Sequence, residues 1–482
     1  MNRMLKISIS LLFSTLFALS VSAQEKWDLQ KCIDYALANN LTVKQSRLNI
    51  ERAEIGLTQS KYALLPNLNA QATYGYNFGQ RIDPFTNEFA TERVQTNNFF
   101  MSSSLDIFNG FSKVNSIKRN EASLSANKYD LATIQNDISL QLCLAYLQIL
   151  RNMENAAIAQ EQLNLTQSQV DRTEVLVEAG QLPQGSLYDA QSQAAQEELN
   201  LVNAENAIVL ARLNLTQLMQ LTPEEAANFE VVKPDLTDEG TELLNNSAMD
   251  IYIRAKQLMP QIQAVEQRKI LADYDVKVAN GNLYPNLSLS GSVGSGYSGA
   301  NRIAVGEGTT GFIPIGQVQG TGTPVITLQP QTVYDDGDFK TKSFNDQLSD
   351  NFNQNLQLNL VIPIFNGLSA KSNLNQAKIN KLEADISYAQ VSNQLRFDIE
   401  QSYADAKAAM NSYLAAQKAV TALEESFNYA QVRFDEGVIN TVQFNDIKTQ
   451  YTNAQSNMTN AKYDFVFRTK ILDFYLGNPI TL

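Results

Sequence analysis

The fold is decided by a stretch that occurs twice, as LDIFNG at residues 105–110 and as IPIFNG at residues 362–367. Each copy ends in Asn-Gly, and the next glycine, Gly180 or Gly437, comes 70 residues later with no proline in between. Proline and glycine are the strongest helix breakers, so each run predicts one continuous helix. At 1.5 Å per residue, such a helix is about 100 Å long.

Apolar residues inside both runs recur at helical spacing. From Leu395 to Leu423 they step by three or four residues, and from Ile117 to Ile138 they step by seven. This pattern is typical of coiled coils. The chain is expected to turn near residues 180–186, after which a return helix completes a hairpin.

The chain is an internal duplication. The two Asn-Gly stretches lie 257 residues apart, and so do Gly180 and Gly437. Upstream, LPNL at residues 65–68 returns as YPNL at residues 284–287, at an offset of 219. The difference of 38 residues falls within 287–362. We therefore expect two copies of one supersecondary unit, the second with a longer loop.

Between each proline motif and each Asn-Gly motif the periodicity changes to two. Polar and apolar residues alternate over 67–78 and 352–362, and more weakly over 99–108 and 286–297. These ranges predict four strands of about 10–12 residues in two hairpins. Such strands suit a membrane barrel, apolar outward and polar inward; a soluble sheet with one wet face is the alternative.

Four strands are too few to close a barrel, and open strand edges are not tolerated in lipid. The chain is therefore expected to oligomerise. Two copies would give eight strands around an interior filled by side chains, whereas three would give twelve strands and room for a pore. A pore function favours the trimer.

Composition excludes several kinds of catalytic chemistry. The 482 residues include no histidine and two cysteines, and the formal net charge is −13. Histidine-dependent nucleophiles and metal sites are impossible, and the acidic balance disfavours nucleic acid as a partner. We expect no catalytic residue, no cofactor and no metal site. In an oxidising compartment Cys32 and Cys143 could pair, but we expect two separately packed thiols.

The N-terminus predicts export. Arg3 and Lys6 precede a short apolar segment, and Val-Ser-Ala at residues 21–23 forms a small-residue cleavage site. Residues 1–23 are therefore expected to be a signal peptide, with an uncleaved anchor helix as the alternative.

These features together resemble the TolC-like outer-membrane efflux proteins. The resemblance rests on the duplicated order of proline, two strands, Asn-Gly and long helix, and on the turns EAGQL (178–182) and DEGVI (435–439). It implies a mixed, mainly α fold with long coiled-coil-like periplasmic helical hairpins and four membrane β-strands per chain. In a homotrimer these would form a shared barrel and a helical tunnel.

The resemblance also implies a location and partners. The protein would lie in the outer membrane, with most of its mass in the periplasm. It would be a passive conduit in a tripartite efflux or type I secretion system. Its partners would be a periplasmic adaptor (membrane fusion protein) and an inner-membrane pump, such as a resistance-nodulation-division or ABC transporter.

The expected organisation has nine segments. They are the signal peptide (1–23), an equatorial segment with the upper helix of repeat 1 (24–64), strand hairpin 1 of the barrel (65–109), periplasmic helical hairpin 1 (110–221), an equatorial linker (222–259), the upper helix of repeat 2 (260–283), strand hairpin 2 (284–366) with a long extracellular loop (298–350), periplasmic helical hairpin 2 (367–476) and a C-terminal tail (477–482). We expect the linker to be non-helical over 222–246 and the long loop to fold over the barrel mouth.

In this family the hairpin turns close the periplasmic entrance. Relatives often carry aspartates six and nine residues after the second glycine; here these positions are Gln443 and Asp446, and in the first repeat they are Ser186 and Asp189. Three copies of Asp446 would form an anionic ring that favours cations. The alternative is that these carboxylates face solvent near a helix N-terminus.

The latch of the best-known relatives is altered in this sequence. The position of its basic residue is Ile439, and the nearby aromatic Phe434 lacks a hydroxyl. We therefore expect closure to rely on apolar packing, and Asp435 and Glu436 to face solvent.

Two further groups are expected to shape the tunnel ends. The tips that meet the adaptor comprise Gly180, Leu182, Gly437 and Ile439, although the glycines could simply be left-handed helix caps. The junction between barrel and tunnel comprises Pro66, Pro285, Pro363, Gly110 and Gly367.

Two other protein classes compete with a channel. A structural coiled-coil envelope protein or adhesin would explain the helices but not the duplicated strands. A periplasmic adaptor would show one hairpin flanked by soluble β-domains.

Overall fold

The computed structural model describes residues 26–90, 93–234, 244 and 246–482. The expected signal peptide lies outside these residues, as does part of the expected equatorial linker. The chain divides into two compact units. The helical unit comprises Met1–Ile55, Glu121–Ala272 and Asn380–Leu482, and the strand unit comprises Gly56–Asn120 and Asp273–Ile379.

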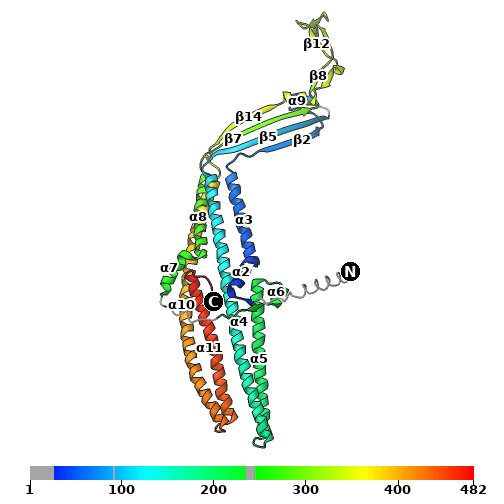
Figure 1. Ribbon diagram of the computed structural model, residues 1–482. Helices are drawn as coiled ribbons and strands as arrows, with labels where there is room; N and C mark the ends of the chain where they lie inside the picture. Colours follow the sequence, from blue (N-terminus) through cyan, green and yellow to red (C-terminus); the bar gives the residue numbers. More distant parts are fainter. Residues whose placement is uncertain (1–25, 91–92, 235–243, 245) are drawn as a thin grey trace, which may run out of the picture. The chain divides into compact units, whose positions relative to one another are not determined.

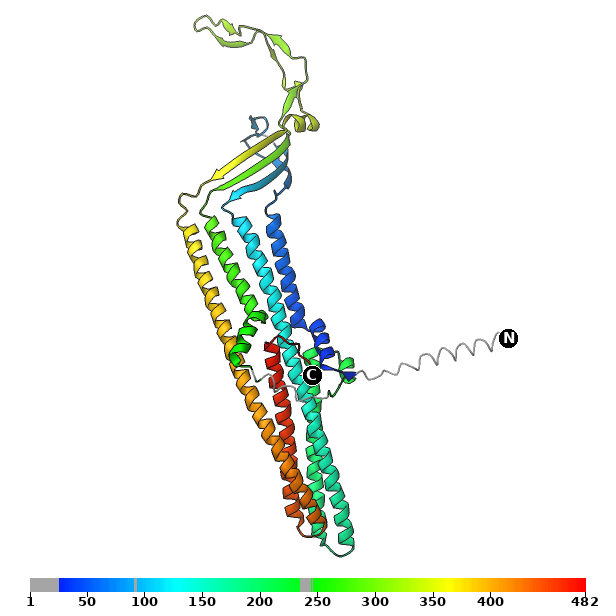
Figure 2. The same cartoon turned by 60° about the vertical axis from the view of Figure 1, so that its left-hand side comes forward.

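Two helical hairpins make up most of the helical unit. Their long helices are α4 (Ser112–Glu178) and α10 (Ser369–Asp435), of 67 residues each, and their return helices are α5 (Gln184–Met219) and α11 (Thr441–Tyr475). Figure 1 and Figure 2 show α4 beside α5 and α10 beside α11. Each run without proline and glycine is thus one uninterrupted helix.

None of the helices in the described ranges combines enough length with enough apolar character to cross a membrane.

Short elements pack around these hairpins. Strand β1 (Lys26–Trp27) pairs in parallel with β6 (Glu230–Val231), with helices α2 (Leu29–Asn39) and α6 (Pro223–Ala227) next to them in the sequence. Helix α7 (Ala248–Leu258) packs elsewhere, against α11. The prediction of a non-helical stretch over 222–246 was wrong for α6. Thr222 and Glu225 form a capping box there, and Pro223 stands at the first helical position, where its missing N–H costs no hydrogen bond.

The largest core of the helical unit surrounds Tyr146, which is almost fully buried. Its hydroxyl lies 2.5 Å from the carbonyl oxygen of Val232 and 3.0 Å from that of Trp27, so it ties α4 to the β1–β6 pair. Cys32 and Cys143 are buried in the same core, and both are free. Burial raises the pKa of each thiol to about 12, which keeps both sulfurs protonated and unreactive. The expectation of two separate thiols is confirmed.

The strand unit contains one four-stranded antiparallel sheet (Figure 2). Its strands are β2 (Asn69–Asn77), β5 (Val94–Asn109), β7 (Asn286–Ser298) and β14 (Asn353–Val361), in the spatial order β14-β7-β5-β2. Helices α3 (Leu41–Tyr62) and α8 (Pro260–Gly281) precede β2 and β7. The β5–β7 pair, called the seam below, joins the two repeats. The four expected strands are all present.

The sheet has one apolar and one polar face. Across the seam Met101 lies opposite Val293 and Leu105 opposite Leu289, whereas Ser102 on the other face lies opposite Ser292. Successive residues of a strand point to opposite faces, so the alternation seen in the sequence separates the two kinds of side chain.

The long loop of the second copy forms a β-ribbon of three nested antiparallel pairs. These are β8 (Arg302–Ala304) with β13 (Phe339–Thr341), β9 (Thr309–Gly311) with β12 (Gln331–Val333), and β10 (Pro314–Gln317) with β11 (Pro324–Ile326). The short turn η2 (Asp336–Asp338) and helix α9 (Phe344–Asp350) complete the loop.

A buried polar cluster joins the end of β7 and helix α9 to the shorter loop of the first copy, which carries the β3–β4 pair (Arg81–Ile82 and Phe89–Ala90). The Ser298 hydroxyl donates to the Asp83 carboxylate, and the Gln347 side chain accepts from Ser298 N (2.9 Å) and donates to Ser298 O (3.0 Å). All three side chains are fully buried. Their mutual hydrogen bonds offset the cost of removing them from water.

The duplication is visible element by element. Shifting α2 and α3 by 219 residues gives the bounds of α7 and α8, and shifting α4 by 257 gives the bounds of α10. Left-handed backbone recurs at the same offset of 257: Gly110 and Gly367 have φ of 62° and 64°, and Gly180 and Gly437 both have 73°. The repeats therefore share backbone conformation even where their side chains differ.

Candidate gate at the hairpin turns

Both long helices end in the same glycine cap. Gly180 N donates to Val177 O at 2.9 Å, and Gln181 N donates to Leu176 O at 2.9 Å. The second turn repeats this, from Gly437 N to Phe434 O (3.1 Å) and from Val438 N to Arg433 O (2.8 Å). These are Schellman motifs, which need left-handed backbone at the glycine. The cap is therefore the local reason for both glycines.

The return helices begin differently in the two repeats. In α11, Gln443 N donates to Asn440 Oδ1 at 2.9 Å, and the Gln443 side chain faces back to Asn440 N in a capping box. In α5, Pro183 occupies the cap position without a side-chain hydrogen bond, and Ser186 N donates to Pro183 O at 3.0 Å. Gln443, a candidate gate residue, therefore also has a structural role, because its hydrogen bonds with Asn440 cap the N-terminus of α11.

The second turn is closed by aromatic packing. Phe444 stacks on Phe434 with ring centroids 4.7 Å apart and lies 5.8 Å from Phe427. Ile439 and Ala430 are buried in the same cluster. Ile439 was expected at the tip surface that meets an adaptor, but its side chain points into this cluster and is buried. This packing lies within one hairpin, so the reliance of closure on apolar packing stays a prediction.

The first turn has a smaller, aliphatic cluster. Val170 and Val177 of α4 pack against Leu187, Ala190 and Ala194 of α5. At the tip itself the side chain of Leu182 is exposed, as are both turn glycines.

Arg172 of α4 joins the first hairpin to the turn of the second. Its guanidinium forms an ion pair with the Asp435 carboxylate and donates a second hydrogen bond, 3.1 Å long, to the Asp435 carbonyl. It also lies 5.7 Å from the centroid of the Phe434 ring. Asp435 was expected only to face solvent; it is half-exposed and ion-paired. Nothing in the local sequence marked Arg172, because its partner is 263 residues away.

Lys448 of α11 makes a second link to α4. Its ammonium donates to the hydroxyl of Thr166 and lies 3.4 Å from the carbonyl oxygen of Gln162. Only 4% of the residue is exposed, and within the described chain no carboxylate forms an ion pair with it. Burial lowers the pKa of Lys448, and the more distant Glu197 carboxylate partly opposes this. The four-residue spacing from Phe444 places Lys448 on the packed face of the helix, and this spacing is visible in the sequence.

The two candidate gate carboxylates lie on exposed helix surface. Asp189 is the sixth residue of α5, and Asp446 is the sixth residue of α11. Both are exposed in the single chain, whereas Ser186 is half-buried. A ring of Asp446 side chains would exist only between copies of the chain.

The junction residues lie where strands meet helices in the strand unit. Pro66 and Pro285 stand between a helix and the strand that follows, and Pro363 is the second residue after β14. Gly110 packs against Gly281 so closely that an added Cβ would lie 2.3 Å from Gly281 O. Gly367, at the equivalent position, has open space around it.

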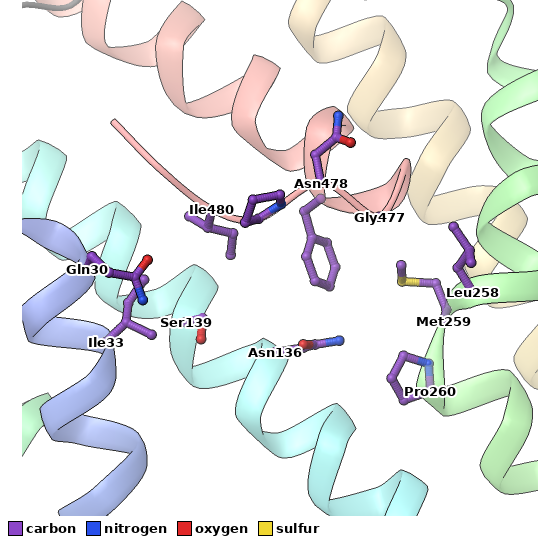
Figure 3. Close-up of a pocket in the computed structure, with 12 residues that line it drawn as sticks. Gln30, Ile33, Asn136, Ser139, Leu258, Met259, Pro260, Gly477, Asn478 and Ile480 are labelled. Carbon is purple, nitrogen blue, oxygen red and sulfur yellow. The ribbon is translucent and has the colours of Figure 1, made fainter.

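A cavity of about 490 Å³ lies among α2, α4, the α7–α8 corner and the end of α11 (Figure 3). Its lining comprises Gln30, Ile33, Asn136, Ser139, Leu258, Met259, Pro260, Phe474, Gly477, Asn478, Pro479 and Ile480. None of these side chains titrates near neutral pH, so the cavity supplies no general acid or base, and no base lines it to activate the Ser139 hydroxyl.

A duplicated helical hairpin, capped by glycine at each turn and joined to amphipathic membrane-type strands, defines the class of outer-membrane efflux channels. The family described as "Outer membrane efflux protein" matches residues 32–220 and 251–478. The chain belongs to this family; it is an outer-membrane channel protein and not an enzyme.

Individual relatives agree with this assignment. The chain is 24% identical to Outer membrane protein TolC of Escherichia coli (strain K12) over 490 residues, covering 99% of this chain and 87% of that protein. The outer membrane protein VceC of Vibrio cholerae has a similar fold, with a TM-score of 0.72 and 17% identity over 94% of this chain and 96% of that one. The CmeC channel of Campylobacter jejuni also gives a TM-score of 0.72, with 17% identity over 94% and 86% of the two chains. The expected mainly α fold with long hairpins and four strands is confirmed.

Proposed function

We propose that this chain forms a homotrimer that works as a passive conduit across the outer membrane, fed by a periplasmic adaptor and an inner-membrane pump. The observation that carries the proposal is the four-stranded sheet, which is amphipathic and open at both edges. Three copies would supply twelve strands, enough to surround a pore with the polar face inward. Specificity is then proposed to come from the pump.

The hairpin turns are proposed to close the periplasmic entrance. Within one chain, Arg172 and Lys448 hold the second hairpin to α4. Opening would require the second hairpin to move against the first, so these two contacts would act as latches. Asp446 and Asp189 would place carboxylates around the entrance and favour cations.

The hairpin tips are the proposed docking surface for the adaptor. The exposed residues there are Gly180, Leu182 and Gly437, and the exposed Val438 takes the place expected for Ile439. Contact at tips is small, so useful affinity depends on several tips binding at once.

Imaging and conductance test the proposal together. The detergent-extracted protein should give threefold end views and should carry ion current in planar bilayers. Monomeric rods without conductance would instead support a coiled-coil envelope protein without a channel.

A further inference from the structure

The four strands of the sheet are almost free of charge. Among the residues of β2, β5, β7 and β14, Asp106 of β5 is the one charged side chain. The polar face is otherwise made mainly of hydroxyl and amide groups. Its cross-strand rows include Ser104 with Ser290 and Gln357, and Ser102 with Ser292 and Asn355. Such a wall offers hydrogen bonds to a solute of either charge and favours neither.

Asp106 lies on this polar face, near the end of β5 that leads into α4. It is opposite Ser288 of β7, which in turn is opposite Asn359 of β14. A carboxylate on an otherwise neutral pore wall attracts cations and repels anions. Three copies of the chain would place three such carboxylates in a ring where the strands meet the helices.

Lys113, the second residue of α4, supplies the opposite charge. Its ammonium lies 2.8 Å from Asp106 Oδ2 and donates a 2.7 Å hydrogen bond to the carbonyl oxygen of Ala63, which directly follows α3. The side chains of Lys113 and Asp106 are 27% and 33% exposed in the single chain. The ion pair therefore lies at the surface of the polar wall, where a passing ion would meet its net charge.

The internal duplication shows that the two charges belong together. The offset of 257 places Pro363 at the position of Asp106 and Ala370 at the position of Lys113. The second repeat therefore lacks both charges, whereas the first repeat has both. Either charge alone would give the wall a net charge at this end, and neither repeat carries one alone.

We propose that Asp106 and Lys113 set the charge preference of the barrel. As a pair they keep its polar wall neutral, so the barrel passes cationic and anionic solutes alike. Any preference for cations then arises at the hairpin turns, where Asp446 lies, and not in the barrel. The inference rests on the proposed trimeric channel with the polar face inward.

A cysteine beside the ion pair measures the local charge in the full-length protein. Ser288→Cys places a thiol directly opposite Asp106. The probes are two methanethiosulfonates, one with a cationic trimethylammonium group and one with an anionic sulfonate group. The ratio of their rate constants, cationic over anionic, is divided by the same ratio for a small free thiol. This normalised ratio reports the local potential, because the reactivity of the thiol itself cancels. The native cysteines are buried and should not react.

The variants should shift this ratio in opposite directions. Lys113→Gln should raise it several-fold, Asp106→Asn should lower it several-fold, and the double variant should return it to the value of the intact pair. Lys113→Arg keeps the charge and should leave the ratio unchanged. The matched control is Lys371→Gln, which removes an exposed lysine from the first turn of α10, where Pro363 replaces the strand carboxylate. It should change the ratio less than Lys113→Gln does.

Salt separates an effect of charge from a change of structure. The shifts should shrink as the salt is raised from about 0.1 M to about 1 M, because the Debye length falls from about 10 Å to about 3 Å. Shifts that persist at high salt would overturn the inference.

The remaining outcomes distinguish this inference from the proposed channel. If the thiol of Ser288→Cys reacts with both probes but neither single variant changes the ratio, the ion pair does not set the local potential. The inference then fails while the pore stands. If the thiol in the folded trimer reacts with neither probe, the polar face does not line an aqueous pore, and the proposed channel fails as well.

Discussion

Arg172→Gln is the perturbation that tests the proposed gate most directly. The substitution removes the charge that links α4 to the turn between α10 and α11, and it leaves a polar side chain on an exposed helix. Because Arg172 is half-exposed, the fold should tolerate the change. The closed state of the entrance, in contrast, should be destabilised.

The expected loss of free energy in Arg172→Gln is the sum of three contacts. The side chains of Arg172 and Asp435 are 45% and 47% exposed, so their ion pair is worth about 0.5 kcal/mol after solvent screening. The hydrogen bond to the Asp435 carbonyl adds about 0.5–1 kcal/mol. The cation–π contact with Phe434 adds a similar amount, about 0.5–1 kcal/mol at an exposed site.

Arg172→Gln therefore lowers the free energy that favours the closed state by about 1.5–2.5 kcal/mol per chain. Asp435→Asn loses only the ion pair and lowers it by about 0.5 kcal/mol. Since about 1.4 kcal/mol is a factor of ten, the open fraction per chain should rise about 10- to 60-fold in the first variant and about twofold in the second. The double variant should resemble Arg172→Gln alone.

The assay is conductance of the purified protein in planar bilayers, supported by uptake of a large antibiotic by cells that carry each variant. Arg433→Gln is the matched control, because Arg433 lies two residues before Asp435 and its guanidinium lies over Tyr429 of the same helix, 5.9 Å from the ring. It removes the same charge without removing the contact between hairpins.

Two results would refute the reasoning. Equal conductance of Arg172→Gln and Arg433→Gln would mean that net charge, and not the contact, sets the closed state. A larger effect of Asp435→Asn than of Arg172→Gln would mean that the carboxylate has a partner outside this chain.

Three further predictions concern other parts of the molecule. Lys448→Met should not lower thermal stability, because the buried ammonium has only neutral acceptors. Burial lowers the pKa of Lys448 from 10.5, so the wild type should gain stability relative to this variant as pH rises from the lowered pKa towards 10.5; a pH-independent difference in Tm would contradict this. Asp446→Asn should weaken block of the current by multivalent cations more than Asp189→Asn does, and equal block in both variants would argue against an anionic ring. Deletion of residues 309–333 leaves the Asp83–Ser298 hydrogen bond in place and should raise resting uptake of antibiotics; unchanged uptake would count against a role at the barrel mouth.

The long helices and the strands could be predicted because their signals are local. Two runs without proline or glycine are sufficient to predict α4 and α10, and alternation of polar with apolar residues is sufficient to predict the strands of the sheet. The helix α7 was missed because its pattern is short, although its counterpart α2 lies 219 residues earlier at the same position of the repeat. The prediction that Ile439 lies on the tip surface was wrong because the side chain of a turn residue can point to solvent or into the hairpin. Only the aromatic cluster around Phe444 decides between the two orientations.

The sequence by itself determined the duplication, because the two copies can be compared residue by residue. It also determined the length of the helices, the amphipathic strands and the glycine turns, since each of these depends on residues close together in the chain. The tertiary structure alone decided which helix faces which. Arg172 meets Asp435, and Lys448 meets Thr166, across 263 and 282 residues. Helical periodicity says which face of a helix is apolar, but the partner of that face depends on how each helix is rotated about its axis. That rotation is set by the packing of all four long helices together.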